Sequence, residues 1–115
     1  MNYGKINKPK EYISINKFGK YLHSNNFIIQ YKNEIIDKDL KKCNIRLGIT
    51  ASKKIGNAVA RNLIKRRLKI IFHNAINEQK AKYSLFIVIG KKNIVNLDYK
   101  GLVFEFNNAF KKINN

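Results

Sequence analysis

Residues 51–72 read ASKKIGNAVARNLIKRRLKIIF, a stretch rich in lysine and arginine that contains no acidic residue. Within it, Gly56 stands where a loop would lead into a helix. The residues beyond it carry apolar side chains at helical spacing, which places them on one face of a helix: Ala60, Ile64, Leu68, Ile71 and Ala75. We therefore expect a helix over about residues 57–80 whose apolar face enters a core.

The neighbouring arc of the same helix carries four cations and one amide: Arg61, Asn62, Lys65, Arg66 and Lys69. Like charges four residues apart destabilise an isolated helix, so this row indicates a polyanionic partner. Ser52, Lys53 and Lys54 precede the helix, and Gly56 would let the backbone approach a phosphate closely. A solvated, lysine-rich face is the plainer alternative, but arginine and asparagine add forked and amide hydrogen bonds that lysine lacks.

The composition of the chain supports a nucleic-acid partner. Its 115 residues suffice for one domain, and 24 Lys+Arg against 7 Asp+Glu give a formal net charge of +17. An anionic membrane surface is the second candidate, but no apolar run approaches the length of a membrane span. RNA is favoured over DNA because no helix-turn-helix pattern is evident. The single cysteine, Cys43, excludes an intrachain disulfide, and together these features favour the cytoplasm.

The remaining elements are expected from periodicity and turn residues. A short first helix, with Tyr12 and Leu22 in its apolar stripe, should end near Gly19, after a flexible basic arm over residues 1–9. Residues 27–31 and 45–50 should form two antiparallel strands, and residues 83–90 a strand buried on both faces. Asp98 is a candidate N-cap for a last helix whose apolar stripe is Leu102, Phe106, Ala109, Phe110 and Ile113. This order predicts a compact α+β sandwich with helices packed on a mixed sheet.

Residues suited to catalysis are scarce in this chain. Asp37 and Asp39 form the only close acidic pair and lie in a polar connection, which is typical of turn residues. His23 and His73 lie far apart in the sequence, and no phosphate-binding glycine loop occurs. The sequence therefore favours a binding protein over a protein active site. The aromatic residues Tyr12, Phe18, Phe27 and Tyr31 are suited either to stacking on bases or to core packing.

Residues 52–69, SKKIGNAVARNLIKRRLK, resemble the signature of the bacterial ribonuclease P protein component, G-N-A-V-x-R-N-x-x-K-R followed by a basic residue. The strand residues Arg46, Leu47 and Gly48 and the spacing of the other elements extend the resemblance over nearly the whole chain. The resemblance implies the family's α+β sandwich, with a mixed sheet of about four strands. It also implies a left-handed strand–helix–strand crossover, against the general preference for right-handed connections.

The resemblance further implies a function. The chain would be a protein subunit whose partners are a large catalytic RNA and precursor tRNA, with no membrane and no protein partner required. The RNA, with Mg²⁺, would remove the 5′ leader, and the protein would assist, broaden substrate specificity and hold no metal in a dedicated site. The matching RNA-binding positions are Lys53, Lys54, Gly56, Asn57, Arg61, Asn62, Lys65, Arg66 and Lys69, and the matching positions of the leader cleft are Tyr12, Phe27 and Ile28.

The chain departs from the family pattern at four positions. Leu63 and Lys69 stand where many members carry arginine, and Asn16 and Gln30 where the leader cleft often has aromatic residues. A structural RNA-binding protein of a ribosome-like particle would explain the charge and the size equally well, but not the signature. A stand-alone nuclease is disfavoured because no cluster of carboxylates is evident.

Overall fold

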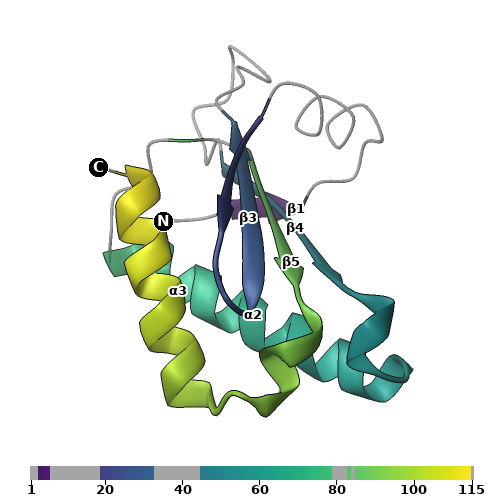
Figure 1. Ribbon diagram of the computed structural model, residues 1–115. Helices are drawn as coiled ribbons and strands as arrows, with labels where there is room; N and C mark the ends of the chain where they lie inside the picture. Colours follow the sequence, from purple (N-terminus) through teal and green to yellow (C-terminus); the bar gives the residue numbers. More distant parts are fainter. Residues whose placement is uncertain (1–2, 6–18, 33–44, 79–82, 84, 115) are drawn as a thin grey trace.

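The computed structural model describes residues 3–5, 19–32, 45–78, 83 and 85–114, and shows one sheet with two α-helices (Figure 1). The strands are β1 (Tyr3–Lys5), β2 (Lys20–His23), β3 (Phe27–Lys32), β4 (Ile45–Ala51) and β5 (Leu85–Gly90). The helices are α2 (Ala58–Glu78) and α3 (Tyr99–Asn114), and the short 3₁₀ helices are η1 (Lys53–Ile55) and η2 (Lys92–Asn96).

The sheet is mixed, and its strand order is β1-β4-β5-β3-β2. β4 lies parallel to both β1 and β5, whereas β3 is antiparallel to both β5 and β2. The predicted α+β class is thus confirmed. The two strands predicted first, β3 and β4, do run in opposite directions, but they are not neighbours because β5 lies between them. The handedness of the crossover from β4 through α2 to β5 stays a prediction.

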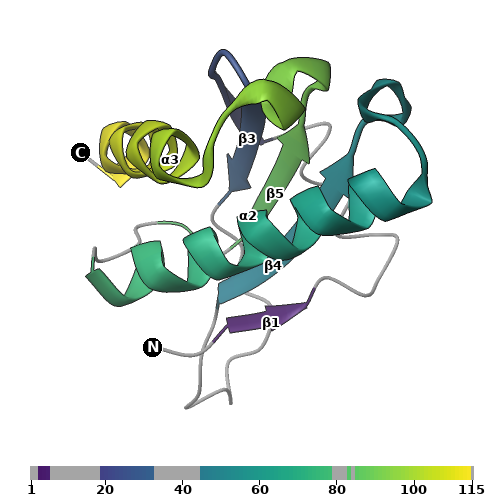
Figure 2. The ribbon, with the colours of Figure 1, turned by 90° about the horizontal axis from the view of Figure 1, so that it is seen from below.

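Both α-helices pack on the same face of the sheet (Figure 2). Phe72 of α2 lies at the centre of this core, where its ring centroid is 5.3 Å from that of Phe86 on β5 and 5.8 Å from that of Phe110 on α3. The apolar stripe predicted for α3 is buried throughout, and that of α2 is buried except at part-exposed Ala60. Helical periodicity therefore identified the core-facing sides of both helices.

The starts of the two α-helices are capped by side chains. Asn57 Oδ1 accepts a hydrogen bond from the backbone N–H of Ala60 at 2.9 Å. Asp98 Oδ1 accepts one from the N–H of Gly101 at 2.8 Å, which confirms the predicted N-cap.

Residues 20–23 do not continue a helix, contrary to the expectation that Leu22 belongs to the first helical stripe. They form β2, which pairs with β3 from Lys20 opposite Tyr31 to His23 opposite Ile28. Pairing with β3 satisfies the backbone groups on the inner side of this edge strand and packs Leu22 against the core. Residues 12–18 of the predicted first helix and the polar connection over residues 33–44 lie outside the described residues. The arm predicted over residues 1–9 contains β1.

Candidate nucleic-acid interface

The turn between β4 and α2 is built around Ser52. The backbone N–H of Ser52 donates to the carbonyl oxygen of Gly90 at 3.1 Å, and its hydroxyl oxygen accepts from the N–H of Lys54 at 3.2 Å. The first bond ties the turn to the end of β5, and the second caps η1, whose backbone bond runs from the Ile55 N–H to the Ser52 carbonyl oxygen at 3.0 Å. In η1, Ile55 is buried while Lys53 and Lys54 are exposed. The apolar residue anchors the turn, and both predicted RNA-binding lysines face solvent.

Gly56 has a backbone conformation that few other residues adopt. Its φ is +150° and its ψ is −150°, a region that is essentially restricted to glycine. Asn57 follows and caps α2 through its side-chain oxygen. Both predicted RNA-binding residues therefore have a structural role in directing the chain from η1 into the helix.

The charged arc of α2 faces solvent as predicted. Asn62, Lys65, Arg66 and Lys69 are exposed. Three of them, together with Val59, line a shallow hollow of about 540 Å³ on the helix surface: Asn62, Lys65 and Arg66. The structure thus brings two cations and one amide to a single concave surface.

Arg61 lies at the edge of this arc, and its residue is only partly exposed. Its Nε atom is buried and has no hydrogen-bond partner among the described residues. A buried donor without a partner is unfavourable by about 1–3 kcal/mol. The Arg61 guanidinium would therefore gain from a rearrangement that brings an acceptor such as a phosphate oxygen to Nε.

The electrostatic environment of this surface is positive. No acidic residue occurs between Asp39 and Glu78, and Glu78 ends α2. At 1.5 Å per residue, Glu78 is about 26 Å along the helix axis from Arg61. This separation exceeds the Debye length of about 8 Å at physiological salt, so Glu78 does not neutralise the start of the helix. The positive end of the helix dipole adds to the same field.

The two described residues that were predicted for a leader cleft lie on opposite faces of the sheet. Phe27 is 0% exposed and packs against Phe106 of α3, with ring centroids 5.5 Å apart. Side chains alternate along a strand, so Phe27 faces the helices and Ile28 faces the opposite side of the sheet. The leader contact expected for Phe27 is therefore corrected to core packing, whereas Ile28 remains on a face without α2 and α3. Tyr12 lies outside the described residues.

Two aromatic side chains on that opposite face were missed by sequence reasoning. Tyr21 pairs across the strands with Gln30, and His23 pairs with Ile28, so all four residues share one face. The Tyr21 and His23 rings are stacked, with centroids 6.2 Å apart, and Tyr21 is 47% exposed. The alternation of Tyr21, Leu22 and His23 was the available signal, but this segment was assigned to the end of a helix.

The described residues contain no group of three or more His, Cys, Asp or Glu side chains that could hold a metal ion. In the same part of the chain, no helix has the length and apolar character needed to cross a membrane.

Comparisons with known proteins agree with the sequence signature. The family model for Ribonuclease P matches residues 2–114. The ribonuclease P protein component of Streptococcus agalactiae is 34% identical over 99 residues, which cover 85% of this chain and 83% of the relative.

Solved structures show the same similarity. The Staphylococcus aureus RNase P protein superposes with a TM-score of 0.78 at 26% identity, covering 96% of this chain and 97% of that chain. A Staphylococcus aureus RNase P protein mutant with defective mRNA degradation activity superposes with a TM-score of 0.76 at 26% identity, covering 94% of this chain and 86% of that chain. The chain therefore belongs to the bacterial ribonuclease P protein family, the protein components of an RNA-containing endoribonuclease.

Proposed function

We propose that this chain binds the catalytic RNA of ribonuclease P through η1 and α2, and the 5′ leader of precursor tRNA through the sheet face opposite the helices. In this proposal the RNA subunit removes the leader in the cytoplasm, and the protein assists. The observation that carries the proposal is the exposed cationic surface of η1 and α2, in which no acidic residue occurs from Lys53 to Lys69.

The cationic surface would act by neutralising phosphates. Lys53, Lys54, Lys65, Arg66 and Lys69 are all exposed, so their charged groups can reach a backbone of phosphates without unfolding the helix. An RNA that cleaves another RNA must bring two polyanions together. A protein of charge +17 at their junction lowers this repulsion and hence the concentration of Mg²⁺ that the reaction needs.

The Mg²⁺ ions are assigned to the RNA subunit in this proposal. The surface of α2 that would face RNA carries cations and an amide, and cations repel a divalent metal ion. Bound to the RNA, Mg²⁺ would activate a water molecule as the nucleophile and would stabilise the leaving oxygen. The protein residues act only on binding and orientation.

The opposite face of the sheet would bind the single-stranded leader. Ile28 offers an apolar contact there, and the neighbouring Tyr21 and His23 rings offer stacking surfaces, which bases use in single-stranded RNA complexes. Mature tRNA has no leader and loses these contacts. The protein would thus favour precursor over product.

The test is cleavage of a precursor tRNA by a bacterial ribonuclease P RNA at limiting Mg²⁺, with and without the protein. We expect cleavage at the mature 5′ end to depend on the protein. Arg66→Ala should reduce this stimulation more than Lys100→Ala, which removes an exposed cation from α3 instead. Equal reductions would mean that only total charge matters and would contradict the assignment to α2.

Two further arms separate the alternatives. Binding of both RNAs without stimulated cleavage would favour a structural RNA-binding protein. The protein alone should cleave neither precursor tRNA nor an mRNA. The mRNA arm is included because one Staphylococcus aureus relative is described through a defect in mRNA degradation. Cleavage by the protein alone would transfer the active site to the protein and overturn the proposal.

A further inference from the structure

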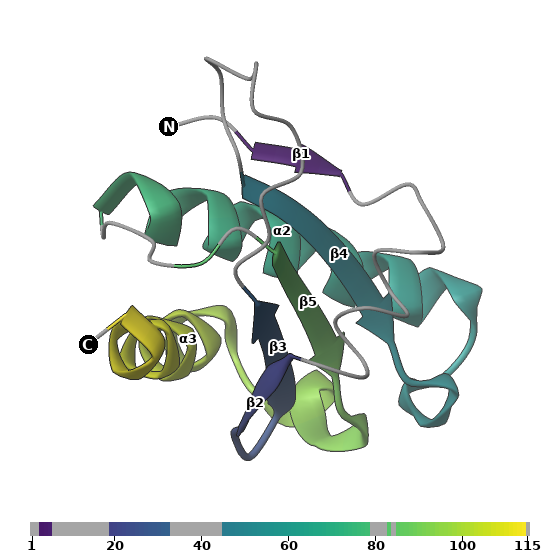
Figure 3. The same cartoon turned by 90° about the horizontal axis from the view of Figure 1, so that it is seen from above.

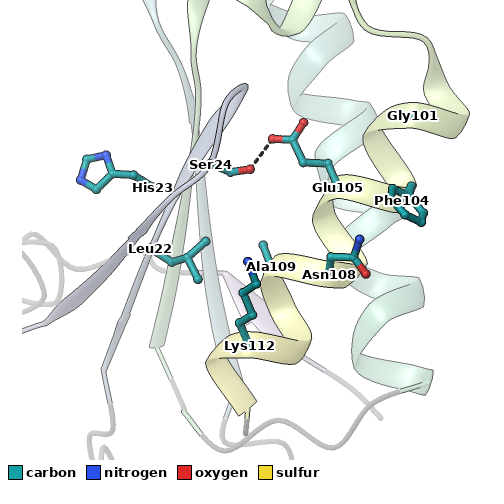
Figure 4. A pocket seen from close by; sticks show the side chains of 9 residues that line it. All are labelled: Leu22, His23, Ser24, Gly101, Phe104, Glu105, Asn108, Ala109 and Lys112. Carbon is teal, nitrogen blue, oxygen red and sulfur yellow. Dashed lines mark hydrogen bonds between the residues drawn. The ribbon is translucent and has the colours of Figure 1, made fainter.

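A second hollow lies between α3 and the turn that joins β2 to β3 (Figure 4). Its volume is about 490 Å³, and the residues that line it are Leu22, His23, Ser24, Gly101, Phe104, Glu105, Asn108, Ala109 and Lys112. The Leu22 side chain points toward α3, whereas the His23 ring points away from it (Figure 4). We call this hollow the α3 groove. η1 and α3 lie at opposite ends of the molecule, so the groove is separate from the charged surface of α2 (Figure 3).

The wall of the α3 groove is fixed by Glu105. Both of its carboxylate oxygens accept hydrogen bonds from the β2–β3 turn. Oε2 accepts from the Ser24 hydroxyl and, at 3.1 Å, from the backbone N–H of Asn26. Oε1 accepts from Asn26 Nδ2 at 2.6 Å. Lys91 Nζ donates to the Ser24 carbonyl oxygen at 2.6 Å and strengthens the same corner. The carboxylate is thus directed at the turn (Figure 4).

Three other lining residues share one side of α3. Phe104, Asn108 and Lys112 follow one another at intervals of four residues, which places them in a row along the helix. Phe104 is 70% exposed, and Asn108 and Lys112 are also exposed. A ring exposed to this degree beside a hollow can stack on a planar partner that enters the hollow.

We propose that the α3 groove binds a nucleotide of single-stranded RNA. The base would stack on Phe104, Asn108 would hydrogen-bond to the base edge, and Lys112 would contact the adjoining phosphate. This proposal goes beyond the function assigned to α2, because it gives the protein a second RNA contact at its other end.

Charge and size favour a nucleotide over other occupants. Lys112 is the only cation that lines the described groove, Glu105 is engaged by the turn, and the whole chain carries +17. A volume of about 490 Å³ is in the range of small-ligand sites. A docked protein helix would need a row of apolar contacts, whereas Phe104 is the only exposed large apolar residue in this lining.

The test uses photocrosslinking of the full chain to a hexauridylate that contains 5-iodouridine, followed by peptide mapping. Crosslinking reports the site directly, which matters because the charged surface of α2 will also bind the oligonucleotide. We expect a crosslinked peptide that contains Phe104. Phe104→Ala should abolish this crosslink, whereas Tyr99→Ala should retain it, because Tyr99 is an exposed aromatic residue of α3 that does not line the groove.

A second measurement follows oligonucleotide affinity in a Lys65→Ala/Arg66→Ala background, in which the α2 surface is weakened. Loss of one stacked base corresponds to about 1–3 kcal/mol, so Phe104→Ala should weaken binding about 5- to 150-fold. Lys112→Ala should reduce the slope of log K against log salt by about 0.7, and Lys111→Ala should change it little. Lys111 is exposed but does not line the groove.

Three outcomes would overturn the proposal. The first is that Phe104→Ala and Tyr99→Ala have equal effects on the crosslink and on oligonucleotide affinity. The second is that all crosslinks lie in η1 and α2. The third is a concentration-dependent dimer that Phe104→Ala abolishes, because a second copy of the chain would then occupy the groove. Failure here is distinguishable from failure of the proposed function. Phe104→Ala should leave binding of the catalytic RNA through α2 intact, and Arg66→Ala should leave the Phe104 crosslink intact.

Discussion

The charged arc of α2 leads to a quantitative prediction about salt. Lys65 and Lys69 are exposed, lie one turn apart and point away from the core, so the double variant Lys65→Ala/Lys69→Ala should fold normally. The matched control is Lys100→Ala/Lys111→Ala, which removes two exposed cations from α3. Both variants lower the net charge by the same amount, and they differ only in where the charge is lost.

The expected magnitude comes from counterion release. Each phosphate neutralised by a protein cation contributes about −0.7 to the slope of log K against log salt for single strands, and about −0.9 for a double helix. If Lys65 and Lys69 each contact one phosphate of the catalytic RNA, the variant should have a slope smaller in magnitude by about 1.4–1.8. Between 50 and 200 mM salt, the wild type should therefore lose about 7- to 12-fold more affinity than the variant.

The assay is filter binding of the protein to a bacterial ribonuclease P RNA at several concentrations of KCl and constant Mg²⁺. The control variant should retain the slope of the wild type within error. Equal changes of slope in both variants would mean that α2 is one part of a general positive field and would contradict the prediction. An unchanged slope in both variants would mean that the two lysines contact no phosphate, which would also contradict it.

Three other substitutions test the scaffold behind the sites. Phe72→Ala removes a ring that contacts β5 and α3, and it should lower the free energy of unfolding by about 3–5 kcal/mol in urea titrations, with Phe72→Leu costing much less. Gly56→Ala forces a side chain onto a backbone with φ of +150° and should cost about 1–3 kcal/mol in the same titration, whereas a fully stable variant would show that the turn relaxes freely. Glu105→Ala removes the carboxylate that accepts a hydrogen bond from the backbone N–H of Asn26. In hydrogen-exchange measurements, this N–H should exchange at least about tenfold faster, while the backbone N–H groups of α2 keep their protection.

The parts of the fold with strong local periodicity were predictable. The buried side of α3 follows from a spacing of three and four residues, and its cap at Asp98 follows from residue type at the start of the pattern. The cap that Asn57 provides for α2 was not predicted. The sequence also singled out Gly56, because a glycine lets the backbone approach a phosphate closely. Its positive φ is a second reason for a glycine at this position, and only the three-dimensional path of the turn reveals it.

The parts set by contacts distant in sequence were not predictable. β2 has four residues, and only pairing with β3 distinguishes it from a continuing helix. The position of β5 between β3 and β4 depends on the packing of α2 across the sheet, which no local pattern encodes. Residue type left Phe27 open between base stacking and core packing, and the family resemblance placed it in the leader cleft. Its register opposite Gly90, on the face beneath α3, decides for the core.

The sheet buries one side of each α-helix. The face of the sheet that carries Phe27 and Phe86 packs against α2 and α3, so those helices expose only their outer sides. The outer side of α2 carries the exposed cations, and α3 carries the groove around Phe104, with η1 and α3 at opposite ends of the molecule (Figures 2 and 3). Substitutions at distant surfaces without shared partners usually have additive effects. Under the two proposals each surface can therefore be weakened alone, and losses at Arg66 and at Phe104 would report on different RNA contacts.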